Sequence, residues 1–286
     1  MAQQKFVTFA SVSSSNLPMV SQVFTRLIFA RLGLAIGVVT GGLTALASGQ
    51  PAQGANSAVA SQPVLVELFT SEGCSDCPPA DDLLGYVDAN QPIPGAHVIV
   101  LSEHVTYWNH LGWRDPFSLD DIDERQKQYE ARFGVSSSYT PQIVVDGAVQ
   151  FVGNNSGKLG GAVASAAAKP KAKLAIEDAH LVGGALSFSV RGDNNSGATL
   201  VAAVAQNASR SEVVRGENAG RTLHHVAVVR AIKDFGSKAT DGRPLRLSGA
   251  LSSGTGKTEG PLRLVVFLAD RRTGHVLAIA EQTFNL

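Results

Sequence analysis

The chain has 286 residues, with 24 basic and 24 acidic side chains, a hydrophobic content of 44% and two cysteines. This composition is typical of a globular protein with a sizeable core, and it excludes an intrinsically disordered chain. The net charge of zero gives no support to nucleic acid as a partner, and two cysteines cannot form a framework of several disulfides.

The N-terminal region has the composition of a targeting segment. Residues 1–66 contain three basic residues and no acidic one, and the apolar stretch 32–47 ends in Ala-Leu-Ala. This pattern is typical of a signal peptide with its cleavage site. We therefore expect a signal peptide over residues 1–47, a small polar linker over 48–62, and export to the periplasm or outside the cell. An uncleaved N-terminal anchor, the one part that would touch a membrane, is the alternative.

Strand and helix patterns alternate between residues 63 and 169. Apolar, β-branched runs predict strands at 64–69, 97–102, 142–146 and 148–152, and helical periodicity predicts helices at 78–90, 119–133 and 156–168. Asp146-Gly147 predicts a tight hairpin between the last two strands. The resulting order, β-α-β-α-β-β-α, indicates an α/β domain over residues 63–169.

The middle helix has recognisable end signals in the sequence. Ser118, followed three residues later by Asp121, predicts a capping box with Asp in place of Glu. Gly134 predicts the end of the helix after Phe133.

Residues 172–286 form a second region with a different pattern. Short β-rich runs are separated by Gly, Asn, Asp and Ser, and they predict strands at 172–176, 185–190, 198–206, 222–230, 244–251, 261–269 and 275–283. With little helical periodicity, this pattern favours an antiparallel β-sandwich domain joined to the first domain near Pro170.

The two cysteines, Cys74 and Cys77, form a C-x-x-C motif between the first predicted strand and the first predicted helix. Backbone N–H groups and the dipole at a helix N-terminus favour a thiolate, so the motif indicates thiol–disulfide chemistry. The intervening Asp76 opposes thiolate formation and predicts a less oxidising pair. Pro78 fits the first helical position, which would make Cys77 the N-cap and leave Cys74 in the loop. A purely structural disulfide and a metal site are the alternatives for the pair.

Five separated motifs make the chain resemble the thioredoxin superfamily, and more narrowly a family of exported thioredoxin-like proteins catalogued only as uncharacterised domain number 1223. The resemblance covers about residue 63 to the C-terminus. The motifs are FTSEGCSDCPPAD (69–81), HVTYWNHLGWRDPF (104–117), RQKQY (125–129), YTPQIVVDG (139–147) and VVRGENAGRTLHH (213–225).

The resemblance implies roles for several of these residues. Cys74 would attack a substrate disulfide and Cys77 would resolve the mixed disulfide. Pro141 would follow a cis peptide bond and pack against the disulfide, and Thr140 would offer backbone groups to the substrate. A trans proline at the start of an edge strand is the alternative.

Four further groups of residues are candidates for the site. Trp108 and Trp113 could line a binding groove or simply cover one end of the sheet. His104 could shuttle a proton, join the two thiolates as a metal ligand, or be an ordinary hydrogen-bonded histidine. Glu217 and Arg221, in a glycine-rich turn, could reach the cysteines, although a local pair between them is the favoured interpretation. The paired His224 and His225 point to opposite faces of a strand.

The sequence thus predicts an exported thiol–disulfide oxidoreductase that acts on exported protein disulfides and exchanges electrons with an unidentified redox partner. No cofactor is expected for this chemistry. One alternative is a copper- or other metal-binding protein using Cys74, Cys77 and His104, because soft thiolates suit Cu(I). The other is a thioredoxin-like interaction module without catalytic activity.

Overall fold

The computed structural model describes residues 61–182, 185–193, 197–237, 245–248 and 261–284. The expected signal peptide (1–47) and almost all of the expected linker (48–62) lie outside the described residues. In the described part of the chain, no helix has the length and apolar character needed to cross a membrane.

The elements predicted for residues 63–169 are all present, with ends within two residues of those expected. They are β1 (Gln62–Thr70), α1 (Pro78–Asn90), β2 (Ala96–His104), α2 (Asp120–Phe133), β3 (Gln142–Val145), β4 (Val149–Val152) and α3 (Ser156–Ala167). Local sequence signals were sufficient here because β1, β2 and β3 are largely continuous buried runs, and β4 follows the predicted Asp146-Gly147 turn.

The helix ends follow the sequence at two of three predicted positions. Cys77 is the N-cap of α1 and is followed by Pro78. Gly134 ends α2 in the left-handed conformation, at φ 65°. The capping box at Ser118 is wrong, because the N-cap of α2 is Leu119 and the Ser118 hydroxyl instead donates to the Asp115 carbonyl at 2.9 Å. Three aspartates in the first turn of α2 favour its N-terminus electrostatically instead.

The predicted strands of the second region also form, as far as the described residues reach. They are β5 (Leu174–Val182), β6 (Ala185–Gly192), β7 (Ala198–Glu212), β8 (Thr222–Asp234), β9 (Leu245–Ser248), β10 (Leu262–Asp270) and β11 (Val276–Phe284). The part of the expected strand 244–251 outside β9 lies outside the described residues.

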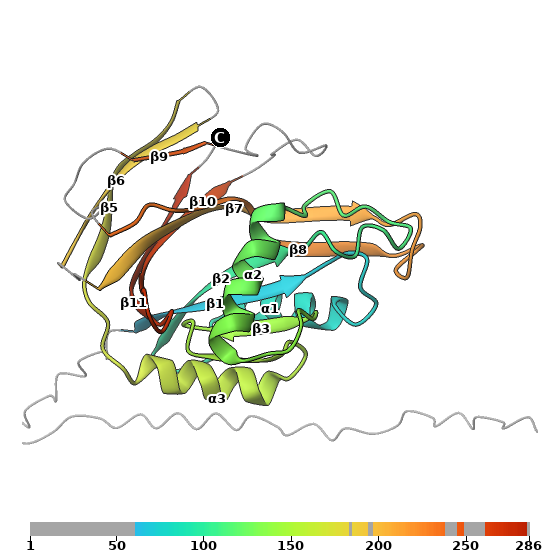
Figure 1. Cartoon of the computed structure of the whole chain (residues 1–286), viewed down its shortest axis with the longest axis horizontal. Coiled ribbons are helices and arrows are strands. Elements are labelled where there is room, and N and C mark those ends of the chain that lie inside the picture. The colour runs from blue at the N-terminus through green and yellow to red at the C-terminus, as the bar shows by residue number, and fades with distance from the viewer. Residues whose placement is uncertain (1–60, 183–184, 194–196, 238–244, 249–260, 285–286) are drawn as a thin grey trace, which may run out of the picture. The chain divides into compact units, whose positions relative to one another are not determined.

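One large mixed sheet joins the two regions (Figure 1). Its strand order is β11-β10-β7-β8-β2-β1-β3-β4. β1 and β2 are parallel over nine residue pairs, and β3 is antiparallel to β1. β8 pairs in parallel with β2 where Ser102 faces Val228. The molecule is therefore mixed α/β, with a large sheet and three helices among the described residues.

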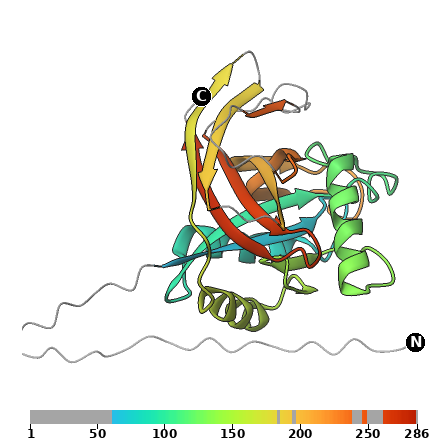
Figure 2. The same ribbon diagram turned by 60° about the vertical axis from the view of Figure 1, so that its left-hand side comes forward.

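A smaller sheet, in the order β5-β6-β9, covers one face of the large sheet near β7, β10 and β11 (Figure 2). Alternating residues of β7 explain how one strand serves two cores. Leu200, Ala202 and Val204 pack in the core beneath the small sheet. Val201 and Ala203 pack in the core shared with α1, α2 and α3.

The expected division into domains at residues 63–169 and 172–286 is not followed by the sheet. Strands from both ranges are hydrogen-bonded in one sheet, and residues 56–286 form one compact unit. The pattern of residues 172–286 predicts a series of strands, and these are present, but alternation of apolar residues does not specify which strand pairs with which. The division itself remains a prediction about folding units.

Helices α1 and α2 lie on opposite faces of the large sheet. Leu68 of β1 lies with Ala80 of α1 beside Gly153. The preceding residue, Glu67, instead bonds to Arg125 of α2 at 2.6 Å. Because consecutive strand residues point to opposite faces, these two contacts place the helices on opposite sides. Figure 1 shows α2 crossing in front of β1 and β2.

The predicted hairpin turn at Asp146-Gly147 is present and connects distant parts of the chain. Both residues have positive φ, at 49° and 60°. A Cβ atom at Gly147 would lie 2.1 Å from the Gly274 carbonyl oxygen, so only glycine fits this close backbone approach. The Asp146 carboxylate accepts the Leu65 N–H at 2.9 Å and pairs with Lys171 at 2.7 Å.

Candidate functional site

The cysteines lie in a turn of residues 71–77, here called the cysteine turn, between the end of β1 and the start of α1. Cys74 and Cys77 form a disulfide with their Cα atoms 5.4 Å apart. The Cys74 N–H donates to the Ser71 carbonyl at 3.1 Å, and the Cys77 N–H donates to the Cys74 carbonyl at 3.3 Å. Both cysteines are buried, with relative exposures of 1% and 0%, whereas Ser75 and Asp76 between them are exposed.

Trp108 connects the cysteine turn to the predicted Thr140-Pro141 element. Its Cβ atom lies 3.0 Å from where a Cβ atom would stand on Gly73. Its indole N–H donates to the Thr140 hydroxyl at 2.8 Å. The Thr140–Pro141 peptide bond is cis, as expected. Trp108 and Thr140 therefore lie together at the edge of the cysteine turn.

Trp113 contacts the cysteine turn through the buried carboxylate of Glu72. Its indole N–H donates to one oxygen of Glu72 at 2.7 Å, and Glu72 is completely buried. Both tryptophans are half-buried, and each makes a structural contact through its indole N–H. The binding-groove interpretation of the two side chains stays a prediction.

The glycine-rich turn of the second region reaches the cysteine turn. We call it the 213–221 segment; it connects β7 to β8. Glu217 accepts the Ser75 N–H at 3.1 Å, and the Asn218 amide donates to the carbonyls of Glu72 and Cys74, both at 2.9 Å. Arg221 donates to Asn218 at 3.0 Å. The favoured local pair between Glu217 and Arg221 is therefore wrong, because each of them binds another partner.

His104 is buried in the sheet and hydrogen-bonded on both sides. Its Nδ1 lies 2.7 Å from Asp115 and its Nε2 lies 3.3 Å from the Ser102 hydroxyl. All three residues are at most 2% exposed. Burial raises the pKa of Asp115, but His104 and two backbone N–H groups outweigh it and the net pKa is lowered. The hydrogen-bonded interpretation of His104 is confirmed, and its roles as proton shuttle and metal ligand stay predictions.

His225 lies between two carboxylates next to the cysteine turn. Its Nε2 lies 3.2 Å from Glu72, and its Nδ1 lies 3.8 Å from Asp81 of α1. Burial lowers its pKa, but the two carboxylates outweigh burial and raise the pKa of His225 to about 10. His225 is therefore a buried cation at neutral pH. His224 is exposed, so the paired histidines do point to opposite faces.

No group of three or more His, Cys, Asp or Glu side chains that could hold a metal ion is found within the described ranges. In particular, the ring nitrogens of His104 are engaged by Asp115 and Ser102. The metal alternative with Cys74, Cys77 and His104 gains no geometric support.

The residues that sequence reasoning left without a role are the buried polar ones beneath the cysteine turn. Glu72, Asp81, Asp115 and Asn218 are each at most 6% exposed. The Asp115 carboxylate accepts the Glu72 N–H at 2.9 Å, which links the His104 pair to the turn. In the sequence, these residues are marked only by lying in motifs that are rich in Gly, Trp and Cys and contain several acidic residues. Spacing along the chain does not reveal which of the acidic residues are buried together.

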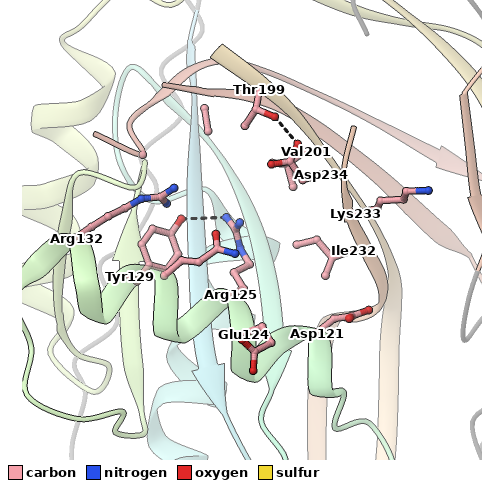
Figure 3. A pocket seen from close by; sticks show the side chains of 13 residues that line it. Asp121, Glu124, Arg125, Tyr129, Arg132, Thr199, Val201, Ile232, Lys233 and Asp234 are labelled. Carbon is pink, nitrogen blue, oxygen red and sulfur yellow. Dashed lines mark hydrogen bonds between the residues drawn. The ribbon is translucent and has the colours of Figure 1, made fainter. Parts of the chain in front are cut away.

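Two cavities elsewhere in the molecule are not lined by either cysteine. One, of about 200 Å³, lies between α2 and strands β7, β8 and β10; Arg125, Tyr129 and Arg132 face it (Figure 3). The other, of about 510 Å³, lies between the β3–β4 hairpin and α3.

A family model described as "Protein of unknown function (DUF1223)" matches residues 65–269. No curated protein matches the chain. A crystal structure of a protein from Agrobacterium tumefaciens has a TM-score of 0.57 and 22% identity, over 79% of this chain and 95% of that one. HBP35 of Porphyromonas gingivalis has a TM-score of 0.48 and 13% identity, over 78% of this chain and 75% of that one. The first similarity indicates a shared fold.

Proposed function

The chain belongs to the DUF1223 family of proteins of unknown function, and from that premise we propose that it is an exported thiol–disulfide oxidoreductase with a thioredoxin-like core. The observation that carries the proposal is the Cys74–Cys77 disulfide, formed within a C-x-x-C turn that leads directly into α1. These are the only two cysteines of the chain, so the bond closes a four-residue ring and does not join distant elements. A bridge across so short a loop stabilises a fold less than one that closes a long loop, which favours a chemical role.

The surrounding elements support the thioredoxin-like part of the proposal. β1 and β2 are parallel, β3 and β4 form an antiparallel hairpin beside β1, and α1 and α2 cover opposite faces. Trp108 and Thr140 border the cysteine turn, where a substrate chain would lie. The remaining strands extend this core by way of β8.

The proposed reaction proceeds in two exchanges. In the reduced protein, the Cys74 thiolate attacks one sulfur of a substrate disulfide, forms a mixed disulfide and releases the other sulfur as a thiolate. The Cys77 thiolate then attacks the Cys74 sulfur, which re-forms the Cys74–Cys77 bond and releases the second substrate thiolate. Two electrons pass to the substrate, and its thiolates take up the protons given up by the cysteines. An external dithiol returns the pair to the reduced state.

The charges next to the cysteine turn predict the redox character of the pair. Asp76 is exposed between the cysteines, and the Glu217 carboxylate occupies the Ser75 N–H. Both negative charges disfavour a thiolate at Cys74, and a destabilised thiolate makes a disulfide less oxidising. A reduction potential as high as that of the strong periplasmic oxidants, measured against glutathione buffers, would contradict this expectation.

The test is reduction of insulin by dithiothreitol, with the wild-type protein and the Cys74→Ser variant as catalysts. We expect turnover with the wild-type protein and none above background with the variant, because the attacking sulfur is missing. Metal analysis of the purified protein accompanies the assay. Absence of turnover together with tightly held copper would replace the proposal with the metal-binding alternative, and absence of both would favour an interaction module.

A further inference from the structure

The disulfide is shielded in the arrangement that the structure has. Cys74 and Cys77 are 1% and 0% exposed, although Ser75 and Asp76 beside them are open to solvent. Disulfide exchange requires an attacking thiolate to reach one of the two sulfurs, so its rate depends on access. A bulky protein thiol therefore cannot reach this bond unless the cysteine turn moves relative to its neighbours.

The 213–221 segment makes the contacts that hold the cysteine turn in place. Glu217 accepts the N–H of Ser75, and the buried Asn218 amide donates to the carbonyls of Glu72 and Cys74. These three bonds join residues 142 to 146 positions apart in the sequence. Two side chains thus fix the backbone on both sides of Cys74.

The segment is itself positioned by close backbone contacts. A Cβ atom on Gly216 would lie 3.0 Å from that of Trp113 and 3.5 Å from its backbone nitrogen. Gly216 and Gly220 have positive φ, at 77° and 80°, on either side of Glu217 and Asn218. This geometry favours glycine and presents the two side chains toward the cysteine turn.

We propose that Glu217 and Asn218 are positioning residues that set the substrate range of the Cys74–Cys77 pair, because they hold the cysteine turn closed against bulky thiols while small thiols still enter. This inference rests on the proposed function and specifies its selectivity. Three hydrogen bonds are involved, and each contributes a modest net free energy. Loss of one or two of them should therefore be enough to let the cysteine turn open.

The test measures how fast added thiols reduce the Cys74–Cys77 disulfide, followed by alkylation and mass spectrometry. The two thiols are dithiothreitol and the reduced B chain of insulin. The rate of each thiol with the protein disulfide is divided by its rate with oxidised glutathione, which corrects for the thiol's own reactivity. In either reaction two thiol hydrogens pass to the cysteines, and the reductant becomes a disulfide. We expect the wild-type protein to react in the normalised assay at least tenfold faster with dithiothreitol than with the B chain.

Two variants remove the contacts. Glu217→Ala removes one bond to the cysteine turn and Asn218→Ala removes two. Each variant is expected to raise the normalised B-chain rate about tenfold or more, with a much smaller change for dithiothreitol. Glu217→Gln keeps an acceptor oxygen and should remain close to the wild-type protein. Glu212→Ala is the matched control. Glu212 is an exposed carboxylate that immediately precedes the 213–221 segment, and it pairs with Arg210 at 2.8 Å.

Equal normalised rates for the two thiols with the wild-type protein would overturn the inference. An unchanged B-chain rate in the Glu217→Ala and Asn218→Ala variants would also overturn it, provided that both variants unfold like the wild-type protein. Equal acceleration of both thiols would also overturn it, since that result indicates a change in the disulfide and not in access. Insulin turnover is measured separately. If the wild-type protein does not catalyse insulin reduction but the thiol rates follow the predicted pattern, the proposed function is contradicted and the inference about access to the disulfide still holds.

Discussion

At the scale of single residues, His225 is the feature that most sharply distinguishes the surroundings of the cysteines. It is 3% exposed, yet Glu72 and Asp81 keep it charged at neutral pH. The same Glu72 also accepts from Trp113, and its backbone carbonyl accepts from Asn218. His225 therefore places a buried positive charge between Glu72 and Asp81, next to the cysteine turn.

This charge predicts a pH-dependent stability. The pKa of His225 rises from an ordinary 6.5 to about 10 on folding, so its contribution is complete below pH 6.5 and is lost as the pH rises through 10. Because one pKa unit corresponds to about 1.4 kcal/mol, we expect several kcal/mol to separate wild type from His225→Gln at pH 6.5, and much less at pH 10. Urea unfolding at the two pH values measures the difference.

The neighbouring His224 provides the control for this experiment. It is exposed, and the same change to Gln should alter the unfolding free energy by no more than about 0.5 kcal/mol at either pH. A His225→Gln variant whose difference from wild type is constant between pH 6.5 and 10 would show that the histidine is not held charged.

At the scale of elements, α2 is attached to the large sheet through a buried ion pair. Arg125 of α2 donates to Glu67 of β1 at 2.6 Å. It also donates to the Tyr129 hydroxyl at 3.0 Å (Figure 3). Burial, and next the charge of Glu67, raise the pKa of the completely buried Glu103 beside them, and Arg125 only partly offsets this. α2 therefore supplies, in Arg125, the positive charge next to the two buried carboxyl groups of the sheet, Glu67 and Glu103.

Removal of that cation should weaken the whole fold. Arg125→Met leaves Glu67 buried without its partner, and we expect a loss of about 3–5 kcal/mol in the free energy of unfolding at pH 7. Arg132→Met on the same helix is the matched control, since Arg132 is exposed and stacks on the Tyr129 ring at 5.8 Å. Urea unfolding that gives equal losses for both variants would contradict this account of α2.

At the scale of the whole molecule, the sequence predicted the elements well and their assembly only in part. Runs such as residues 64–69 and 198–206 are recognisable as strands because their apolar residues are continuous. A continuous apolar run is consistent with burial of β7 on both faces, but nothing local indicates which two cores it joins, or that β8 pairs with β2 at Ser102 and Val228. Strand partners are selected by long-range packing, which one sequence does not display.

The candidate site shows the same limit. The C-x-x-C motif and Thr140-Pro141 could be placed together from the resemblance, whereas Trp108 was a candidate with two open interpretations. The roles of Glu72, Asn218 and His225 could not, since they depend on the 213–221 segment and the start of β8 meeting a turn 144 to 153 residues earlier in the chain.

This assembly predicts that residues 61–169 do not fold alone. Without β7, β8 and β10, the core they share with α2 loses Val201, Ala203 and Phe267, and the edge of β2 is left unpaired. We expect the isolated fragment to show no cooperative transition in urea, by circular dichroism, under conditions where residues 61–286 do. A cooperative transition of the fragment would instead support the boundary expected from the sequence.

The most direct test of the central claim is to trap the reaction of Cys74 with a substrate. Reduced Cys77→Ser is mixed with a peptide that contains one disulfide, and the products are resolved by non-reducing mass spectrometry. We predict a stable mixed disulfide at Cys74, because the resolving sulfur is absent, and a much lower yield with Cys74→Ser. If neither variant forms a mixed disulfide, or if both form it equally, the claim that Cys74 attacks and Cys77 resolves is contradicted.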